Sequence, residues 1–202
     1  SLLVMSASWP SIEVQSVPEL LGVLTELQRR RWLSRGHPQH HGGLVPSIDR
    51  DRLACLTRAR KLDLERRSID TFRASARAFC TTGEAMAMRD DIIALMVLRH
   101  HRVPTRLLDW SISPYVAAYF AVCAEDQLDG EIWAFSYDDY EREGKAQWRR
   151  WPETTWDGSG DDDKFVAGRT AFTVEEPPNW VIAAFYPAGF PRQDAQGGCY
   201  TM

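Results

Sequence analysis

The chain has 202 residues, of which 44% are hydrophobic and 26% charged, and its formal net charge at pH 7 is −4. This length and composition predict one globular domain with a sizeable core, and the acidic balance argues against generic, charge-driven binding of nucleic acid. No apolar run approaches the ~20 residues that a membrane helix needs, so we expect no membrane association and a cytoplasmic location.

The first half of the chain predicts helices around one short strand. Residues 1–17 form an N-terminal extension, and Ser16 can cap a helix that ends in the basic run 29–31. Residues 32–35 predict a strand stopped by Gly36. Residues 60–80 and 84–101 then predict two further helices from their spacing of apolar residues.

The second half predicts shorter elements. Residues 105–110 predict a strand, and Ser113 followed by Pro114 predicts a helix start. Strands follow at 131–137 and 181–185, and a polar insertion that we expect to be a loop covers about 138–170. Cys123 lies in an apolar helical pattern and is expected to be a buried thiol. Long helices before short strands predict an α+β domain over residues 18–202, with the N-terminal and central helices packed on a small, mostly antiparallel sheet.

One candidate site is the segment 32–37, in which Arg35 and Gly36 follow each other inside a short strand. A guanidinium group offers a planar fork that suits phosphate or carboxylate, and glycine lets the backbone approach a ligand closely. We expect the Arg35 guanidinium to be solvated in a cleft. The alternative is a structural salt bridge, because an unpaired arginine is costly to bury.

A second candidate site is the segment 100–111, which gathers two imidazoles, two arginines, a carboxylate and an indole in twelve residues. If the strand is extended, Arg106 and Asp109 face opposite sides, so each could instead pair with a partner such as Arg35. We predict that Arg35, His100, Arg106 and Asp109 converge on one cleft. The alternative is a buried polar network that fixes the junction of helix and strand.

The order of these segments resembles the FRG domain, a family named for a Phe-Arg-Gly signature. The resemblance rests on Arg35-Gly36, on residues 98–111 with the run Pro-Thr-Arg-Leu-Leu-Asp-Trp, and on residues 190–198 as the closing element. It covers about residues 20–202. Three positions depart from the family pattern: Ser34 replaces phenylalanine, Arg99 stands where glutamine is usual, and Arg102 stands where glycine is usual.

The resemblance implies a layout distantly similar to that of ADP-ribosyltransferases, including a split sheet, and an enzyme of bacterial or phage-conflict context that uses NAD. In that scheme Arg35 holds the dinucleotide, Asp109 stabilises an oxocarbenium-like state, and Gln196 bonds a ribose hydroxyl. The ligand-binding residues that it implies are Gly36, His100, Thr105, Arg106, Trp110, Ser111, Tyr119 and Arg192.

No metal is expected. The three histidines at 37, 40 and 41 lack a second ligand pair, and the acidic run 161–163 lacks the oxygen spacing of a calcium loop.

Three functions stay open on the sequence. The first is an NAD-dependent ADP-ribosyltransferase or NAD glycohydrolase acting on a protein or on water. The second is a module that binds a nucleotide or a phosphorylated ligand without turnover, which Gln196 favours because an amide cannot act as a base. The third is a protein-interaction domain that uses the tryptophans at 148, 151 and 156 as anchors.

Overall fold

Five α-helices and two short 3-10 turns surround one sheet in the computed structural model, which describes residues 9–39, 43–76, 90–123, 128–148, 183–185 and 198–201. The helices are α1 (Val17–Arg29), α2 (Arg58–Ala76), α4 (Asp91–His100), α5 (Pro114–Val122) and α6 (Tyr137–Trp148). The strands are β1 (Trp32–His37), β2 (Leu108–Ser111), β3 (Glu131–Ser136), β4 (Ala183–Phe185) and β5 (Gly198–Thr201). The 3-10 turns are η1 (Ser47–Asp49) and η2 (Asp51–Leu53).

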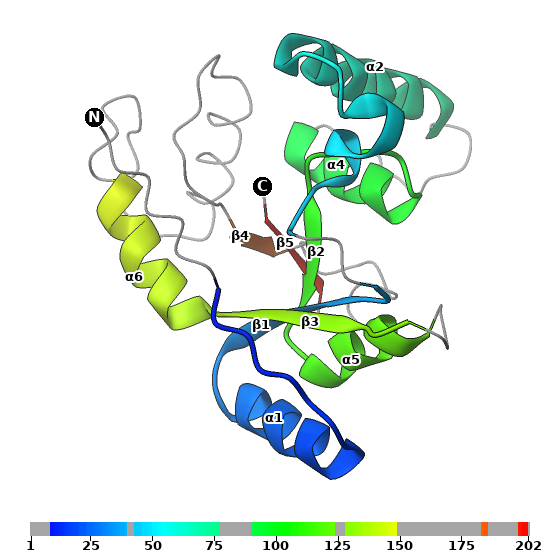
Figure 1. Ribbon diagram of the computed structural model, residues 1–202. Coiled ribbons are helices and arrows are strands. Elements are labelled where there is room, and N and C mark those ends of the chain that lie inside the picture. Colours follow the sequence, from blue (N-terminus) through cyan, green and yellow to red (C-terminus); the bar gives the residue numbers. More distant parts are fainter. Residues whose placement is uncertain are drawn as a thin grey trace, which may run out of the picture.

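The sheet has the order β3-β1-β2-β5-β4, and every neighbouring pair is antiparallel. β1 pairs with β3 along its whole length, but it pairs with β2 at one position alone, Ser34 opposite Ser111. Figure 1 shows β2 turning away from β1 and β3 beyond that position. The expected α+β class, with helices packed on a small antiparallel sheet, is confirmed.

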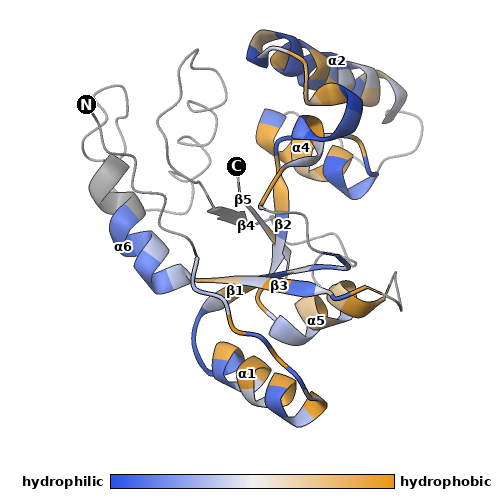
Figure 2. Cartoon of the chain, viewed as in Figure 1, coloured by the Kyte–Doolittle hydropathy of each residue, from blue (hydrophilic) through white to orange (hydrophobic). Residues whose placement is uncertain are grey.

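In Figure 1, α2 and α4 lie above the sheet, α1 and α5 lie below it, and α6 lies to the left. α5 packs against β1, α1 packs against α5, and α6 contacts β1 and β3. α2 and α4 pack against each other near β2. Figure 2 shows apolar and polar residues together along the whole length of α1, as expected for a helix that buries one face.

Two apolar clusters form the core. The first joins α2 and α4 to the sheet through Leu107 and Tyr200, around the fully buried Leu95 and Met96. The second lies on the strands and reaches α6 through Tyr137. Within the described ranges, no helix combines the length and the apolar character needed to cross a lipid bilayer.

α1 and α4 each begin at a side-chain cap, and the cap at Ser16 agrees with the prediction, whereas Ser113 precedes α5 without a side-chain hydrogen bond. The Ser16 hydroxyl accepts from the Glu19 amide at the start of α1, and Asp90 accepts from the Ile92 and Ile93 amides at the start of α4. The cap at Asp90 sets the observed start of α4, later than the predicted start at residue 84.

Arg102 directly follows His101, the C-cap of α4, and has a left-handed conformation with φ of 62°. The Arg102 amide donates to the Arg99 carbonyl at 3.0 Å, and the Val103 amide donates to the Leu98 carbonyl at 3.0 Å. These two bonds are those of a Schellman motif, whose left-handed residue is usually glycine. Arginine therefore holds a backbone conformation here that glycine adopts without strain.

Several predicted elements need correction. The strand predicted at 105–110 begins at Leu108, because the backbone of Thr105 bonds instead to Ser47 and Ile48. The expected loop after residue 138 opens as helix α6, and Cys123 is exposed at the end of α5 rather than buried. The tryptophans at 151 and 156 and the acidic run 161–163 lie outside the described residues.

Candidate functional site

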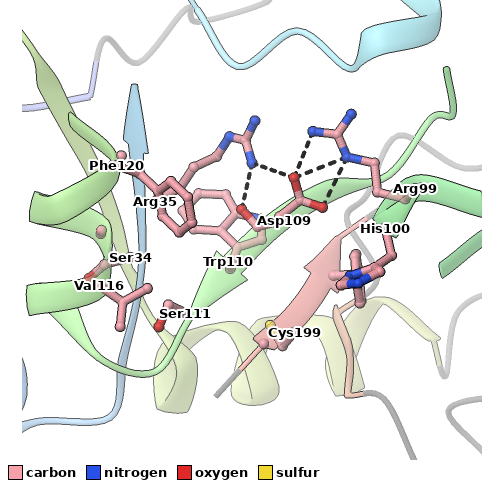
Figure 3. A pocket seen from close by; sticks show the side chains of 14 residues that line it. Ser34, Arg35, Arg99, His100, Asp109, Trp110, Ser111, Val116, Phe120 and Cys199 are labelled. Atoms are coloured by element: carbon pink, nitrogen blue, oxygen red, sulfur yellow. Dashed lines mark hydrogen bonds and ion pairs between the residues drawn. The ribbon is translucent and has the colours of Figure 1, made fainter. Parts of the chain in front are cut away.

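A cavity of about 270 Å³ lies where β1 and β2 stop pairing (Figure 3). Residues of β1, β2 and β5 form part of its wall, and α4 and α5 supply the rest. The residues that line it are Ser34, Arg35, Gly36, Arg99, His100, Asp109, Trp110, Ser111, Val116, Ala117, Phe120, Gly198, Cys199 and Tyr200. The two signature segments of the sequence therefore meet at one cavity.

Arg35 crosses the gap between the two strands. Its Nη1 donates to the backbone carbonyl of Asp109 at 2.7 Å and lies 3.3 Å from the Asp109 carboxylate. The side chain of Arg35 is only 9% exposed. The expectation of a solvated guanidinium is therefore wrong, and the alternative, a structural ion pair, describes these contacts.

Gly36 lines the cavity, but helix packing explains the absence of a side chain. A Cβ atom built at Gly36 would lie 1.9 Å from the Ala117 carbonyl oxygen and 2.7 Å from the Ala121 amide nitrogen. β1 and α5 can approach this closely only because residue 36 is glycine. The close backbone approach that Gly36 permits is therefore to helix α5, whereas the sequence predicts an approach to a ligand.

Asp109 pairs with a second arginine, Arg99, from the last turn of α4. The Arg99 Nε lies 3.0 Å from both carboxylate oxygens, and its Nη2 lies 2.6 Å from Oδ2. The remaining Nη1 donates to the Ser47 hydroxyl at 3.0 Å. Figure 3 shows the carboxylate between the two guanidinium groups.

The charges of this cluster stabilise one another. Burial would raise the pKa of Asp109, but the hydrogen bonds and charge of Arg99, followed by those of Arg35, outweigh it and hold the pKa below its usual value. Burial lowers the pKa of Arg35, and the charge of Asp109 opposes that effect. Burial also acts to lower the pKa of Arg99, but the bonds to Asp109 leave it raised. Asp109 is thus a carboxylate at neutral pH, and the two arginines exceed it by one positive charge.

Asp109 is surrounded by protein and still open to the cavity. Its side chain keeps 45% of its accessible surface, although burial is the largest influence on its pKa. The accessible surface decides what a ligand can reach, whereas the pKa reflects how many protein atoms surround the group.

His37 positions the Arg35 side chain through a hydrogen bond. The Arg35 Nε donates to His37 Nε2 at 2.8 Å, and His37 Nδ1 lies 3.1 Å from a carboxylate oxygen of Glu131. For Nε2 to accept, the proton of a neutral imidazole must be on Nδ1, from which it can bond Glu131. His37 and Glu131 are direct neighbours across β1 and β3. This chain of bonds fixes the plane of the Arg35 guanidinium.

Two further lining residues, Trp110 and Cys199, have little capacity to bond or react with a ligand. The Trp110 Nε1 donates to the Thr201 hydroxyl at 2.7 Å, and the ring stacks edge-on against Phe135, so the indole belongs to the core. Burial, and next the charge of Asp109, raise the pKa of the Cys199 thiol far above neutrality. A buried, protonated thiol is a poor nucleophile.

Ser34 offers an unused polar group at the cavity wall. Its side chain is fully buried, and its hydroxyl has no hydrogen-bond partner in the part of the chain that the structure describes. Buried polar groups are nearly always paired, so such a hydroxyl is a candidate contact for a ligand.

The predicted convergence of four residues is correct for three of them: Arg35, His100 and Asp109 line the cavity. Arg106 does not line it, because its side chain and amide bond to the buried Glu65.

The other predicted ligand-binding residues fall into three groups. Gly36, Trp110 and Ser111 line the cavity, Thr105 is fully buried outside its wall, and Tyr119 is 63% exposed on α5. Gln196 and Arg192 lie outside the described residues.

The sequence reading missed the partners of the predicted residues. His37 could have been found, because residues i and i+2 of a strand share a face and His37 follows Arg35 at that spacing. Arg99 was noted only as a departure from the family pattern. Glu131 and Ser47 had no local signal, because their roles depend on pairings between distant parts of the chain.

One comparison with known proteins gives a match. The family model described as FRG domain matches residues 30–130, which is half of the chain and includes β1, α4, β2 and α5. Neither the curated proteins nor the solved structures give a match.

Proposed function

Since the chain belongs to the FRG domain family, we propose that its cavity binds an anionic, nucleotide-like ligand such as NAD or ADP-ribose, with Arg35 contacting a phosphate. The observation that carries this proposal is the excess of positive charge at the cavity: Arg35 and Arg99 share one carboxylate, Asp109. A recessed site with a surplus guanidinium attracts an anion, and guanidinium groups suit phosphate oxygens.

The dimensions and lining of the cavity support the same ligand class. A volume of about 270 Å³ is at the small end for ligand sites, which suits one part of a dinucleotide. Val116, Ala117 and Phe120 of α5 line it with apolar groups beside the charged cluster. The unpartnered Ser34 hydroxyl adds a neutral polar contact. A charged end next to an apolar wall fits a nucleotide better than a simple inorganic anion.

Turnover of NAD is the second candidate function, and the ionised Asp109 at the cavity favours it. Loss of nicotinamide develops positive charge on the ribose, which a nearby carboxylate stabilises. Two arginines already neutralise Asp109, so binding without turnover ranks first. If the site is catalytic, we expect Gln196→Ala to lower turnover more than affinity.

Calorimetry with ADP-ribose and NAD, beside an assay of nicotinamide release, tests the proposal. We expect the wild type to bind ADP-ribose and Arg35→Lys to bind it about tenfold or more weakly, because lysine keeps the charge but loses the planar fork. Arg31→Lys is the matched control, because Arg31 lies on the surface and pairs with Asp138. Melting temperatures of both variants separate lost binding from lost folding.

A wild-type protein that binds none of these ligands at millimolar concentration would refute the proposal. Equal affinities of Arg35→Lys and Arg31→Lys would remove Arg35 from the site. Nicotinamide release by the wild type, abolished in Asp109→Asn, would place turnover first.

A further inference from the structure

The hydrogen bond from Arg35 to His37 requires a neutral imidazole. The Arg35 Nε donates to His37 Nε2 at 2.8 Å, and a guanidinium nitrogen can donate but cannot accept. His37 Nε2 must therefore keep its lone pair, while Nδ1 carries the proton toward Glu131, 3.1 Å away. A second proton, on Nε2, would set two N–H groups against each other and turn this hydrogen bond into a repulsive contact.

Neither side chain can avoid that contact by turning into solvent. His37 keeps 4% of its side-chain surface exposed, and Arg35 keeps 9%. The Arg35 Nη1 is also held by the carbonyl and carboxylate of Asp109. Protonation of His37 therefore has to displace the Arg35 guanidinium from its place at the cavity wall.

The charged groups around this pair come from several elements. They are Arg35 of β1, Glu131 of β3, Asp109 of β2, Arg99 of α4, and Arg50 beside η1, whose charge acts on Arg35. α5, which packs on β1, contains no acidic or basic residue. α6 pairs its Asp138 and Glu141 with Arg31, which precedes β1 at the end away from His37. Glu131 thus favours a protonated imidazole, and Arg35 opposes it.

We propose that His37 is a positioning residue that must be neutral for the cavity to bind an anion, so that ligand affinity falls in acid. This inference rests on the proposed function and concerns its regulation. With His37 neutral, Arg35 is held in place, and its Nη2, which has no hydrogen-bond partner among the residues described, can donate to a phosphate. With His37 protonated, the imidazolium attracts an anion only through space, whereas the direct charge-assisted bond from Arg35 is lost.

Calorimetry with ADP-ribose from pH 8 to pH 5 tests this inference. ADP-ribose has no terminal phosphate, the group whose second ionisation falls near pH 6, so its charge is constant over this range. Asp109 also keeps its charge, because its pKa is held below its usual value. We expect the affinity of the wild type to fall about tenfold or more, with a midpoint where NMR shows the His37 ring to take up its proton. An imidazole ordinarily does so near pH 6.5.

His37→Gln separates the position of Arg35 from the protonation of residue 37. The amide oxygen of glutamine can accept from Arg35 while its nitrogen donates to Glu131, and an amide does not titrate in this range. We expect His37→Gln to bind ADP-ribose within about threefold of the wild type at pH 8 and to keep that affinity at pH 5. His37→Leu, which offers no acceptor, should bind about tenfold or more weakly at pH 8.

Two other histidines provide the controls. His101→Gln is the matched control, because His101 is exposed at the C-cap of α4 and does not line the cavity. His100→Gln tests the imidazole that does line it. Both variants should keep the pH dependence of the wild type. Melting temperatures measured at each pH show whether every variant is folded.

The outcomes separate this inference from the proposed function. A wild-type affinity that stays constant or rises as the pH falls overturns the inference, while ADP-ribose binding still upholds the proposed function. A pH dependence that persists in His37→Gln, or that His100→Gln removes, also overturns it, because another group is then responsible. If His37→Leu does not fold, His37→Gln decides alone, and weak binding by folded His37→Gln at pH 8 overturns the positioning role. A protein that binds no ADP-ribose at any pH overturns both proposals.

Discussion

Arg99 holds both carboxylate oxygens of Asp109, with its Nε 3.0 Å from each oxygen and its Nη2 2.6 Å from Oδ2. Arg99 lies in the last turn of α4, and Asp109 lies in β2, ten residues further along the chain. The pair therefore fixes the end of α4 to the strand that borders the cavity. Since Arg35 approaches the same carboxylate from β1, Asp109 joins three elements.

The lowered pKa of Asp109 predicts a specific dependence of stability on pH. The folded-state pKa lies below the unfolded value of about 3.9, so the contribution is complete above about pH 4 and is lost as the pH falls through the folded-state pKa. Asp109→Asn removes this contribution. Urea unfolding from pH 7 to pH 2 should show a smaller acid loss of stability in Asp109→Asn than in the wild type. Parallel curves of unfolding free energy against pH for the two proteins would contradict this prediction.

The ion pair of Arg106 with Glu65 predicts a structural role for both residues. Glu65 is 1% exposed, and its two oxygens bond the Arg106 amide and side chain at 2.8 Å each. Glu65→Ala leaves a partly buried guanidinium without its partner, which should cost about 3–5 kcal/mol of unfolding free energy. Urea titration measures this cost. The double variant Glu65→Ala with Arg106→Met should recover part of it, and an additive loss would show that the two side chains do not depend on each other.

The contact of Gly36 with α5 predicts that no side chain is tolerated at position 36. Gly36→Ala should lower the unfolding free energy by at least about 1–3 kcal/mol, because the α5 backbone would have to move. Gly22→Ala is the control: no atom lies within 4 Å of a Cβ built there, in α1. Alanine should stabilise that helix by up to about 1 kcal/mol. Thermal unfolding of the two variants should shift in opposite directions.

The left-handed backbone at Arg102 predicts that glycine at this position stabilises the chain. A non-glycine residue in that conformation costs roughly 1–2 kcal/mol, and glycine loses about 0.4–1 kcal/mol through the entropy of the unfolded chain. Arg102→Gly should therefore add roughly 0.5–1 kcal/mol, or about 1–4 °C in melting temperature. Arg66→Gly, at an exposed position inside α2, should destabilise instead. A fall in melting temperature for Arg102→Gly would show that the left-handed backbone at Arg102 is not strained.

The sequence predicted the elements whose signals are local. Ser16 and the apolar spacing after it define α1, and Ser113 with Pro114 precedes α5 as expected. β5 was missed, because its glycine-rich start and short length are typical of a turn. It is nevertheless an inner strand of the sheet, since pairing with β2 and β4 stabilises it from both sides.

The candidate site was predicted only as far as single residues allow. The signatures identified Arg35 and Asp109, which do meet at one cavity. The sequence could not identify their partners, because the contacts of Arg99 with Ser47 and of His37 with Glu131 depend on the folding of distant segments. Arg106 was misassigned for the same reason, since Glu65 lies 41 residues earlier in the chain.

The single backbone pair between β1 and β2 has a mechanical consequence. The sheet has two parts, one formed by β3 and β1 and the other by β2, β5 and β4. Three features connect these parts: the backbone pair of Ser34 with Ser111, the second apolar cluster, and the ion pairs of Arg35 and Arg99 with Asp109. Within the described sheet, we expect this junction to flex more readily than the fully paired strands, because fewer backbone bonds must break there. A ligand in the cavity would contact both parts of the sheet and hold them together across this junction.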